Sequence, residues 1–325
     1  FSDAEPPEKK YQACVAWLTS DIQDSFEVLV LTVLEQILLG NSASPMRKAL
    51  IESNLGSALS DSTGFDADNR DTMFACGLKD IEKKDVGRVE EIIFSTLRSL
   101  AEDGIDPNMI ESAIHQIEFH RKEITNTPYP FGIKLVLSVV GTVIHDGDPL
   151  SWINMDKDLD RLKEKINQGG FLEERLSRYF IDNPHRVLFT LEPDSELEES
   201  RVKTVKKELA ARLEKMSETE LEQIEKDARA LEVLQETDED LSVLPTLEIS
   251  DVPPKMEIIR PDTIDDVSFS TCYDKATSGI LYFTCPAGGG DIARELFPWV
   301  PFFCKSFTNS GTRKNSYDKM ARLLD

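Results

Sequence analysis

The chain has 325 residues, a length at which about two domains of roughly 150 residues each are expected. Its 60 acidic side chains outnumber 37 basic ones, and the resulting net charge of −23 disfavours binding to nucleic-acid phosphates. Hydrophobic residues make up 40%, enough for ordinary cores, and no apolar run reaches the roughly 18 residues that span a bilayer. We therefore predict neither a nucleic-acid partner nor a membrane partner.

The first 190 or so residues carry patterns of both strands and helices. Residues 12–19 alternate with apolar side chains on both faces, which predicts a central strand. A helix is predicted to run to Leu39 and end at Gly40, and Ser44 caps a second helix that continues to Glu52. Further strands are predicted at 58–62, 72–78 and 186–191, and further helices at 85–101, from 107, at 131–144, 156–166 and 171–181. This mixture predicts an α+β fold.

The segment 192–251 joins this part to a second one. Val202, Val205 and Leu209 recur at helical spacing, and Ser217 with Glu220 forms a capping box that starts another helix. Two helices that meet at one capped turn predict an αα-hairpin. Each helix has a single apolar face, so we expect the hairpin to lie against another surface. Residues 244–254 are punctuated by proline and are expected to be extended.

A second unit is predicted to start near Val267. It contains a strand at 279–284, a loop at 286–290 and a helix at 292–307, followed by a last helix at 317–324. This order repeats the strand–loop–helix pattern of residues 12–40, in pattern rather than identity. Because this unit is expected to be incomplete, apolar side chains around Phe297, Trp299 and Phe303 should be exposed, which predicts self-association or local disorder.

The strongest candidate for a metal site is the run from His115 to His120, which nearly spells the inverted zinc motif HxxEH with Glu118 as base. In HxxEH the second histidine follows the first by four residues, but His120 follows His115 by five. At about 100° per residue the two rings are about 140° apart on a helix, so they cannot share one ion. Glu111 and His115 are four residues apart and are expected to form a surface pair. We predict no metal on this helix.

Other catalytic patterns are also missing from the sequence. The glycines at 288–290 follow a predicted strand, but they lack the spacing of phosphate-binding loops and are expected to form a flexible turn. No G-x-S-x-G occurs, and no cysteine has a catalytic or CxxC context. The five cysteines, Cys14, Cys76, Cys272, Cys285 and Cys304, stand mostly in apolar settings. They are predicted to be buried free thiols in a reducing compartment, either the cytoplasm or an organellar matrix.

Several stretches resemble one known family. They are YQACVAWL at 11–18, SPMRKALIE at 44–52, QIEF at 116–119, DGDP at 146–149, LPTL at 244–247, the acidic hairpin and the final unit 279–325. Their order is similar to the presequence-protease branch of the M16 zinc metallopeptidases, and the resemblance covers essentially the whole chain. It implies LuxS- and mitochondrial-processing-peptidase-like metallohydrolase domains, four per protein, which enclose a peptide-sized chamber.

The resemblance also implies a division of this chain. Residues 1–193 would be the second, non-catalytic domain, 194–240 a helical hairpin hinge, and 241–325 an extended linker with the truncated start of a third domain. The family's HxxEH motif would lie in a first domain outside this chain. In the final unit the equivalent ligand positions fall near Phe302, Lys305 and Ser306, which do not bind zinc, and helix 25–39 has no histidine.

The resemblance therefore implies a central, non-catalytic part of a zinc-dependent oligopeptidase that degrades unfolded peptides. In such enzymes zinc activates water and a glutamate acts as base, and both would be supplied outside this chain. This chain would have no catalytic, cofactor-binding or metal residue. Its partners would be the remaining domains of the same polypeptide and the peptide substrate, and its acidic excess can favour basic peptides. The alternative is a non-enzymatic scaffold or peptide-binding protein with the same fold.

Overall fold

A computed structural model describes residues 9–124, 129–237, 241–255, 258, 260–261, 271–286, 288 and 290–324. Its residues group into two compact units, Phe1–Pro193 with Thr277–Asp325, and Asp194–Ala276.

The first unit is built on an antiparallel sheet. Its strands are β1 (Tyr11–Asp21), β2 (Ala58–Leu59), β3 (Gly64–Asp66), β4 (Asp71–Ile81) and β5 (Arg186–Leu191). The order is β2-β4-β1-β5, with β3 also paired to β4, and Trp17 of β1 lies opposite Phe74 and Arg186. The prediction that the first strand is central is confirmed. Its neighbours β4 and β5 take up the backbone hydrogen bonds along both edges, and the buried side chains of Trp17 and Cys14 point to opposite faces of the sheet.

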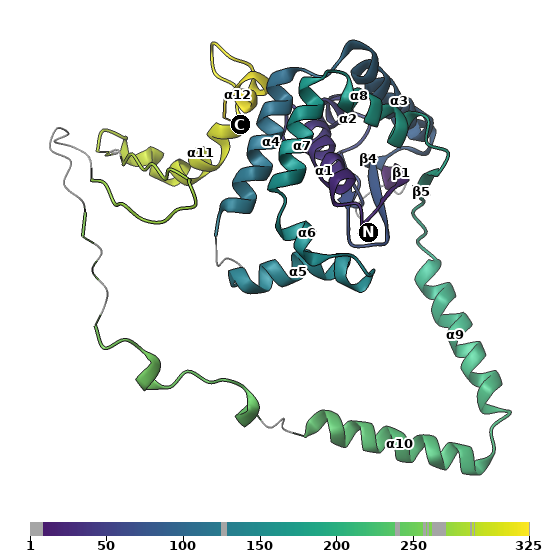
Figure 1. Ribbon diagram of the computed structural model, residues 1–325. Helices are drawn as coiled ribbons and strands as arrows, with labels where there is room; N and C mark the ends of the chain where they lie inside the picture. Colours follow the sequence, from purple (N-terminus) through teal and green to yellow (C-terminus); the bar gives the residue numbers. More distant parts are fainter. Residues whose placement is uncertain are drawn as a thin grey trace. The chain divides into compact units, whose positions relative to one another are not determined.

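Among the described residues, two α-helices follow β1 and six lie between β4 and β5 along the chain (Figure 1). They are α1 (Ser25–Leu39), α2 (Pro45–Glu52), α3 (Val86–Asp103), α4 (Pro107–Lys122), α5 (Phe131–Ile144), α6 (Pro149–Ile153), α7 (Asp156–Asn167) and α8 (Phe171–Leu176). Asp24 and Asp106 cap α1 and α4 by accepting hydrogen bonds from backbone amides of the first turn. The predicted α+β fold is therefore confirmed. The five-residue α6, which Asp148 caps, was not predicted.

The core lies between the sheet and the helices. Helix α1 is buried along most of its length and contacts α4, α7 and α8, while α3 packs on β1 and β4. Trp17 lies at the centre, with its ring centroid 5.4 Å from that of Phe180. Its Nε1 donates to the Phe180 carbonyl at 2.9 Å, which satisfies the only polar atom of the buried indole.

The predicted strand at 279–284 is wrong. No strand of the described residues pairs with this segment, and Leu281 and Phe283 are 91% and 83% exposed. An extended segment becomes a strand only when a neighbour takes up its backbone hydrogen bonds, so strong β propensity alone is not enough. The repeat of the strand–loop–helix pattern therefore does not appear in the fold. The predicted start at Val267 lies outside the described residues.

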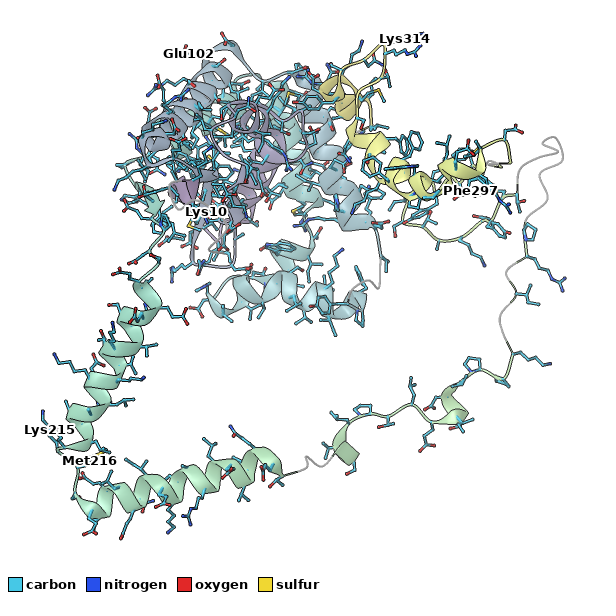
Figure 2. The ribbon with its side chains drawn as sticks, turned by 180° about the vertical axis from the view of Figure 1, so that it is seen from behind. Lys10, Glu102, Lys215, Met216, Phe297 and Lys314 are labelled. Carbon is cyan, nitrogen blue, oxygen red and sulfur yellow. The ribbon has the colours of Figure 1, made fainter. Side chains whose placement is uncertain are left out.

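The predicted helix at 292–307 is broken. A 3-10 turn covers Arg294–Trp299 and contains Pro298, and only α11 (Val300–Ser306) is α-helical. Proline lacks an amide hydrogen and clashes with the preceding turn, which explains the break. The expected exposure of the apolar side chains here is confirmed, since Phe297, Trp299 and Phe303 are 52–64% exposed. Phe297 is labelled in Figure 2.

The predicted last helix is confirmed as α12 (Tyr317–Leu324). It contacts α2 through two polar pairs. Lys48 Nζ lies 3.1 Å from Asp318 Oδ2, and the Tyr317 hydroxyl donates to Glu52 at 2.5 Å. Arg322 approaches Asp106 at the start of α4, at 3.9 Å.

The second unit contains the predicted pair of helices, α9 (Leu197–Leu213) and α10 (Glu218–Glu236). The capping box is confirmed, because the Ser217 amide donates to Glu220 at 2.8 Å and the Glu220 amide donates to the Ser217 hydroxyl at 3.4 Å. Lys215 and Met216 mark the turn between the helices (Figure 2). Every side chain of both helices is exposed, so their apolar stripes are uncovered in this chain.

The prediction for the cysteines is only half right. All five are free, and Cys14 and Cys76 are buried in the sheet, but Cys272, Cys285 and Cys304 are exposed. These three lie in the segment 271–306, whose apolar side chains are also largely exposed. A hydrophobic sequence neighbourhood predicts burial only when other elements pack over it.

Candidate functional site

The histidine run on α4 does not form a site. His115 and His120 are both exposed, and the His120 ring Nδ1 is 2.7 Å from the Gln116 carbonyl oxygen. Glu118 is 2.5 Å from Lys163 of α7, so the carboxylate of the motif is held in an ion pair. Helical geometry thus separates these groups, as the five-residue spacing indicates.

The other positions considered for chemistry are also dispersed. Ser306 donates its hydroxyl to the Phe302 carbonyl at 2.7 Å, and Lys305 is exposed beside it. No helix begins directly after Gly290, and Gly289 lies outside the described residues. Across the described ranges, no group of three or more His, Cys, Asp and Glu side chains could hold a metal ion. The residues present there therefore do not fit zinc.

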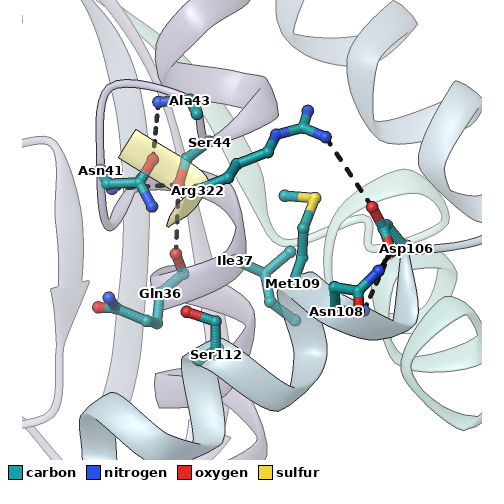
Figure 3. Close-up of a pocket in the computed structure, with 11 residues that line it drawn as sticks. Gln36, Ile37, Asn41, Ala43, Ser44, Asp106, Asn108, Met109, Ser112 and Arg322 are labelled. Atoms are coloured by element: carbon teal, nitrogen blue, oxygen red, sulfur yellow. Dashed lines mark hydrogen bonds and ion pairs between the residues drawn. The ribbon is translucent and has the colours of Figure 1, made fainter. Parts of the chain in front are cut away.

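A small cavity of about 60 Å³ lies between the end of α1, the start of α4 and Arg322 (Figure 3). Its polar groups are largely used by their neighbours. The Asn41 side chain accepts from the Ala43 amide at 2.7 Å, and the Ser44 hydroxyl donates to the Gln36 carbonyl at 3.4 Å. A space of this size holds at most a few water molecules, so it suits a structural role rather than substrate binding.

Helix α5 exposes a cluster of apolar side chains within the first unit. It carries one charged residue, Lys134, and seven apolar side chains that are 37–65% exposed. They are Ile133, Leu135, Val136, Leu137, Val140, Val143 and Ile144. We call these seven residues the α5 face. An exposed cluster of this kind marks a surface that interacts with something else.

Gly141 and Thr142 are buried and attach α5 to the body of the unit. A side chain at Gly141 would meet the Asp68 Cα at 3.3 Å and the Ile22 Cδ1 at 3.4 Å, so glycine permits this close packing. Beyond the helix, Gln23 donates to the His145 carbonyl at 2.6 Å. The exposure of α5 was not foreseen, because a helix apolar on all sides is ordinarily buried in a core.

Acidic side chains border the α5 face. Asp68 packs against Gly141, the Asp68 amide donates to Asp66 at 2.9 Å, and Asp146 and Asp148 follow the helix directly. Asp68, Asp146 and Asp148 are exposed. We call Asp68, Asp146 and Asp148 the acidic rim. An apolar face with such a rim is electrostatically suited to segments that carry both apolar and basic side chains.

Two family models match the sequence. The one described as "Peptidase M16 inactive domain" covers residues 3–117, and a second, described as a region associated with subfamily C of the M16 peptidases, covers residues 191–325. Together they define the class of this chain as an M16 peptidase domain of the inactive type, followed by a region associated with such domains.

Curated relatives agree along the whole chain. The mitochondrial presequence protease of Xenopus laevis is 32% identical over 100% of this chain and 32% of its own length. The chloroplastic and mitochondrial presequence protease 1 of Arabidopsis thaliana is 31% identical over 97% of this chain and 30% of its own. The chain belongs to the M16 peptidase family, in its presequence-protease-like branch. It spans about a third of the length of these relatives.

A solved structure, described as the inactive peptidase domain of a zinc protease from Bordetella parapertussis, is also similar. It is 14% identical and aligns over 57% of this chain and 92% of its own, with a TM-score of 0.46.

Within the residues that the structure describes, no helix is both long and apolar enough to cross a membrane.

Proposed function

We propose that this chain is a non-catalytic part of a zinc-dependent M16 peptidase that degrades unfolded peptides in an enclosed chamber. The proposal rests on two sequence matches taken together, one to a family model and one to longer relatives. Residues 3–117 match the inactive domain of the family, while the whole chain matches presequence proteases about three times its length. The zinc of the whole enzyme would be bound outside this chain.

The proposed division keeps three parts. Residues 1–193 form a second, non-catalytic domain, 194–240 a hairpin hinge, and 241–325 a linker with the start of a third domain. The uncovered apolar stripes of α9 and α10 support a hinge role, because such helices need a surface supplied by other parts of the polypeptide. Closure of two halves around a substrate is a common use of such a connection.

The α5 face supports a role as chamber wall. Unfolded peptides expose apolar side chains, and the α5 face offers a matching apolar surface. The acidic rim adds attraction for basic residues, so basic peptides are the proposed substrate class. The mitochondrial names of the relatives favour an organellar matrix as the compartment.

The proposal is tested in the full-length gene product. Replacing the glutamate of its HxxEH motif should abolish peptide hydrolysis, whereas His115→Ala and His120→Ala in this chain should leave it unchanged. Loss of activity in either histidine variant, with the fold intact, would overturn the proposal.

A peptide-binding scaffold without hydrolysis is the second candidate, and the uncovered α5 face is the observation that favours it. The two candidates differ in one outcome. A full-length product that binds peptides tightly but never cleaves them, with zinc supplied, would establish the scaffold.

A further inference from the structure

A second recess lies between the start of α1, the end of α7 and the start of α8. It measures about 340 Å³, and three cationic side chains line it: Arg161, Lys165 and Arg175. Glu174 is the only acidic residue of its lining. This excess of positive charge is unusual in a chain whose net charge is −23.

Two aromatic rings hold the guanidinium groups in place. The Arg161 Cζ lies 3.8 Å from the centroid of the Phe26 ring, and the Arg175 Cζ lies 4.7 Å from that of Phe171. The two rings are themselves 6.1 Å apart. Cation–π contacts of this kind hold a guanidinium beside a ring without using up its N–H donors.

Most N–H donors of Arg175 are already used in hydrogen bonds within the protein. Its Nε and Nη2 donate to the buried carboxylate of Glu27 at 2.9–3.1 Å, and its Nη1 donates to Glu174 at 3.1 Å. Arg161 and Lys165 differ from it. Within the described part of the chain, neither of these two cations forms an ion pair, although both line the same recess. The positive charges of Arg161 and Lys165 therefore have no anionic partner among the described residues.

The floor of the recess is kept open by glycine. Gly169 and Gly170 both line it, with φ of 81° and 71°, and an added side chain at either would meet nothing within 4 Å. The backbone turns tightly there because glycine tolerates this conformation. As a result, no side chain of residues 169 and 170 occupies the recess beside the cationic groups.

We propose that this recess binds a phosphate group. Two unmatched cations suit a dianion, and the fork of an arginine fits phosphate oxygens with two parallel hydrogen bonds. A carboxylate, with a single negative charge, would leave one cation unmatched. The site goes beyond the proposed function, because it requires neither peptide binding nor hydrolysis.

The test is a calorimetric titration of the chain with inorganic phosphate at constant ionic strength. Saturable binding is expected, and Arg161→Gln with Lys165→Gln should weaken it roughly tenfold or more, the effect of losing a charge-assisted hydrogen bond. The matched control, Lys206→Gln with Lys207→Gln, makes the same charge change on exposed positions of α9 and should bind like the wild type. The single variant Lys165→Gln, which keeps the stacked Arg161, should show an intermediate loss.

Two further ligands define the chemistry. Acetate should bind at least tenfold more weakly than phosphate, as roughly expected for one charge less. Phenyl phosphate distinguishes the source: tighter binding than inorganic phosphate supports a phosphorylated ligand, and weaker binding supports the free ion. The proposal is overturned if the wild type shows no saturable binding, if acetate binds equally well, or if the α9 control loses as much affinity as the recess variant.

Discussion

Arg175 of α8 holds the carboxylate of Glu27 on α1 by three hydrogen bonds, although the two residues are 148 positions apart. Their side chains are only 14% and 10% exposed. The Tyr179 hydroxyl also donates to Glu27, at 2.8 Å. Burial, and secondly this hydrogen bond, raises the pKa of Tyr179 far above its ordinary value, so the phenol keeps its proton.

Removing one partner of this pair should be costly. We expect Arg175→Ala to lower the free energy of unfolding by about 3–5 kcal/mol, because the Glu27 carboxylate would stay buried without a counter-charge. Urea denaturation measures the change. The double variant Glu27→Leu with Arg175→Met should lose much less, since it leaves no buried charge. Equal losses in the single and double variants would contradict this explanation.

Glu35 of α1 gives a pH-dependent prediction. Burial raises its pKa above the ordinary 4.5, although the Phe65 amide, which donates to it at 3.0 Å, acts in the opposite direction. The folded state therefore keeps the proton longer than the unfolded state does. Wild-type stability should fall, relative to Glu35→Gln, as pH rises from 4.5 through the raised pKa.

Thermal unfolding at a series of pH values provides the measurement for Glu35. The glutamine variant should be the more stable protein at neutral pH, and the difference should vanish below pH 4.5, where both states of the wild type are protonated. A variant that is less stable than wild type at pH 7 would show that the raised pKa is not the controlling effect.

The docking of α12 depends on Asp318. A hydrogen bond from the Ser316 side chain, and then Lys48, lowers the pKa of Asp318 to about 2. Ser316 and Asp318 belong to the same segment, so only the Lys48 part of this shift depends on docking. Docking should therefore be strongest above the ordinary value of 3.8 and weaken in part as pH falls through about 2. Hydrogen exchange of the amides of α12 reports its release.

Charge reversal provides a second test of α12 at neutral pH. Lys48→Asp should speed hydrogen exchange in α12, because it places two carboxylates together, and adding Asp318→Lys should restore protection. Exchange that is unchanged in Lys48→Asp would mean that the pair does not hold the helix.

The acidic excess predicts a salt-dependent substrate preference in the full-length product. Hydrolysis of basic peptides should be favoured at low ionic strength, and this preference should shrink toward 1 M salt, where charges are screened beyond about 3 Å. Parallel assays with basic and neutral peptides measure it. A preference that survives high salt would have to come from something other than charge.

Local chemistry explains which features could be predicted. The capping box of Ser217 and Glu220 depends on residues three apart, and the central position of β1 depends on its own alternation, so both could be predicted from sequence.

Features that depend on distant partners could not be predicted. The strand expected at 279–284 lacks a partner strand among the described residues, and the link between Glu27 and Arg175 joins positions with no shared local pattern. The apolar sequence of α5 did not indicate that the helix would be exposed. An apolar composition favours burial, but it does not show whether another element covers the helix. The basic recess was missed for the same reason, since its cations come from α7 and α8.

The central claim is that catalysis requires residues outside this chain. Its most direct test is to incubate the purified chain with an unfolded peptide and added zinc, with and without EDTA, and to follow cleavage by mass spectrometry. The peptide should remain uncut under every condition. Robust turnover that EDTA abolishes would contradict the claim.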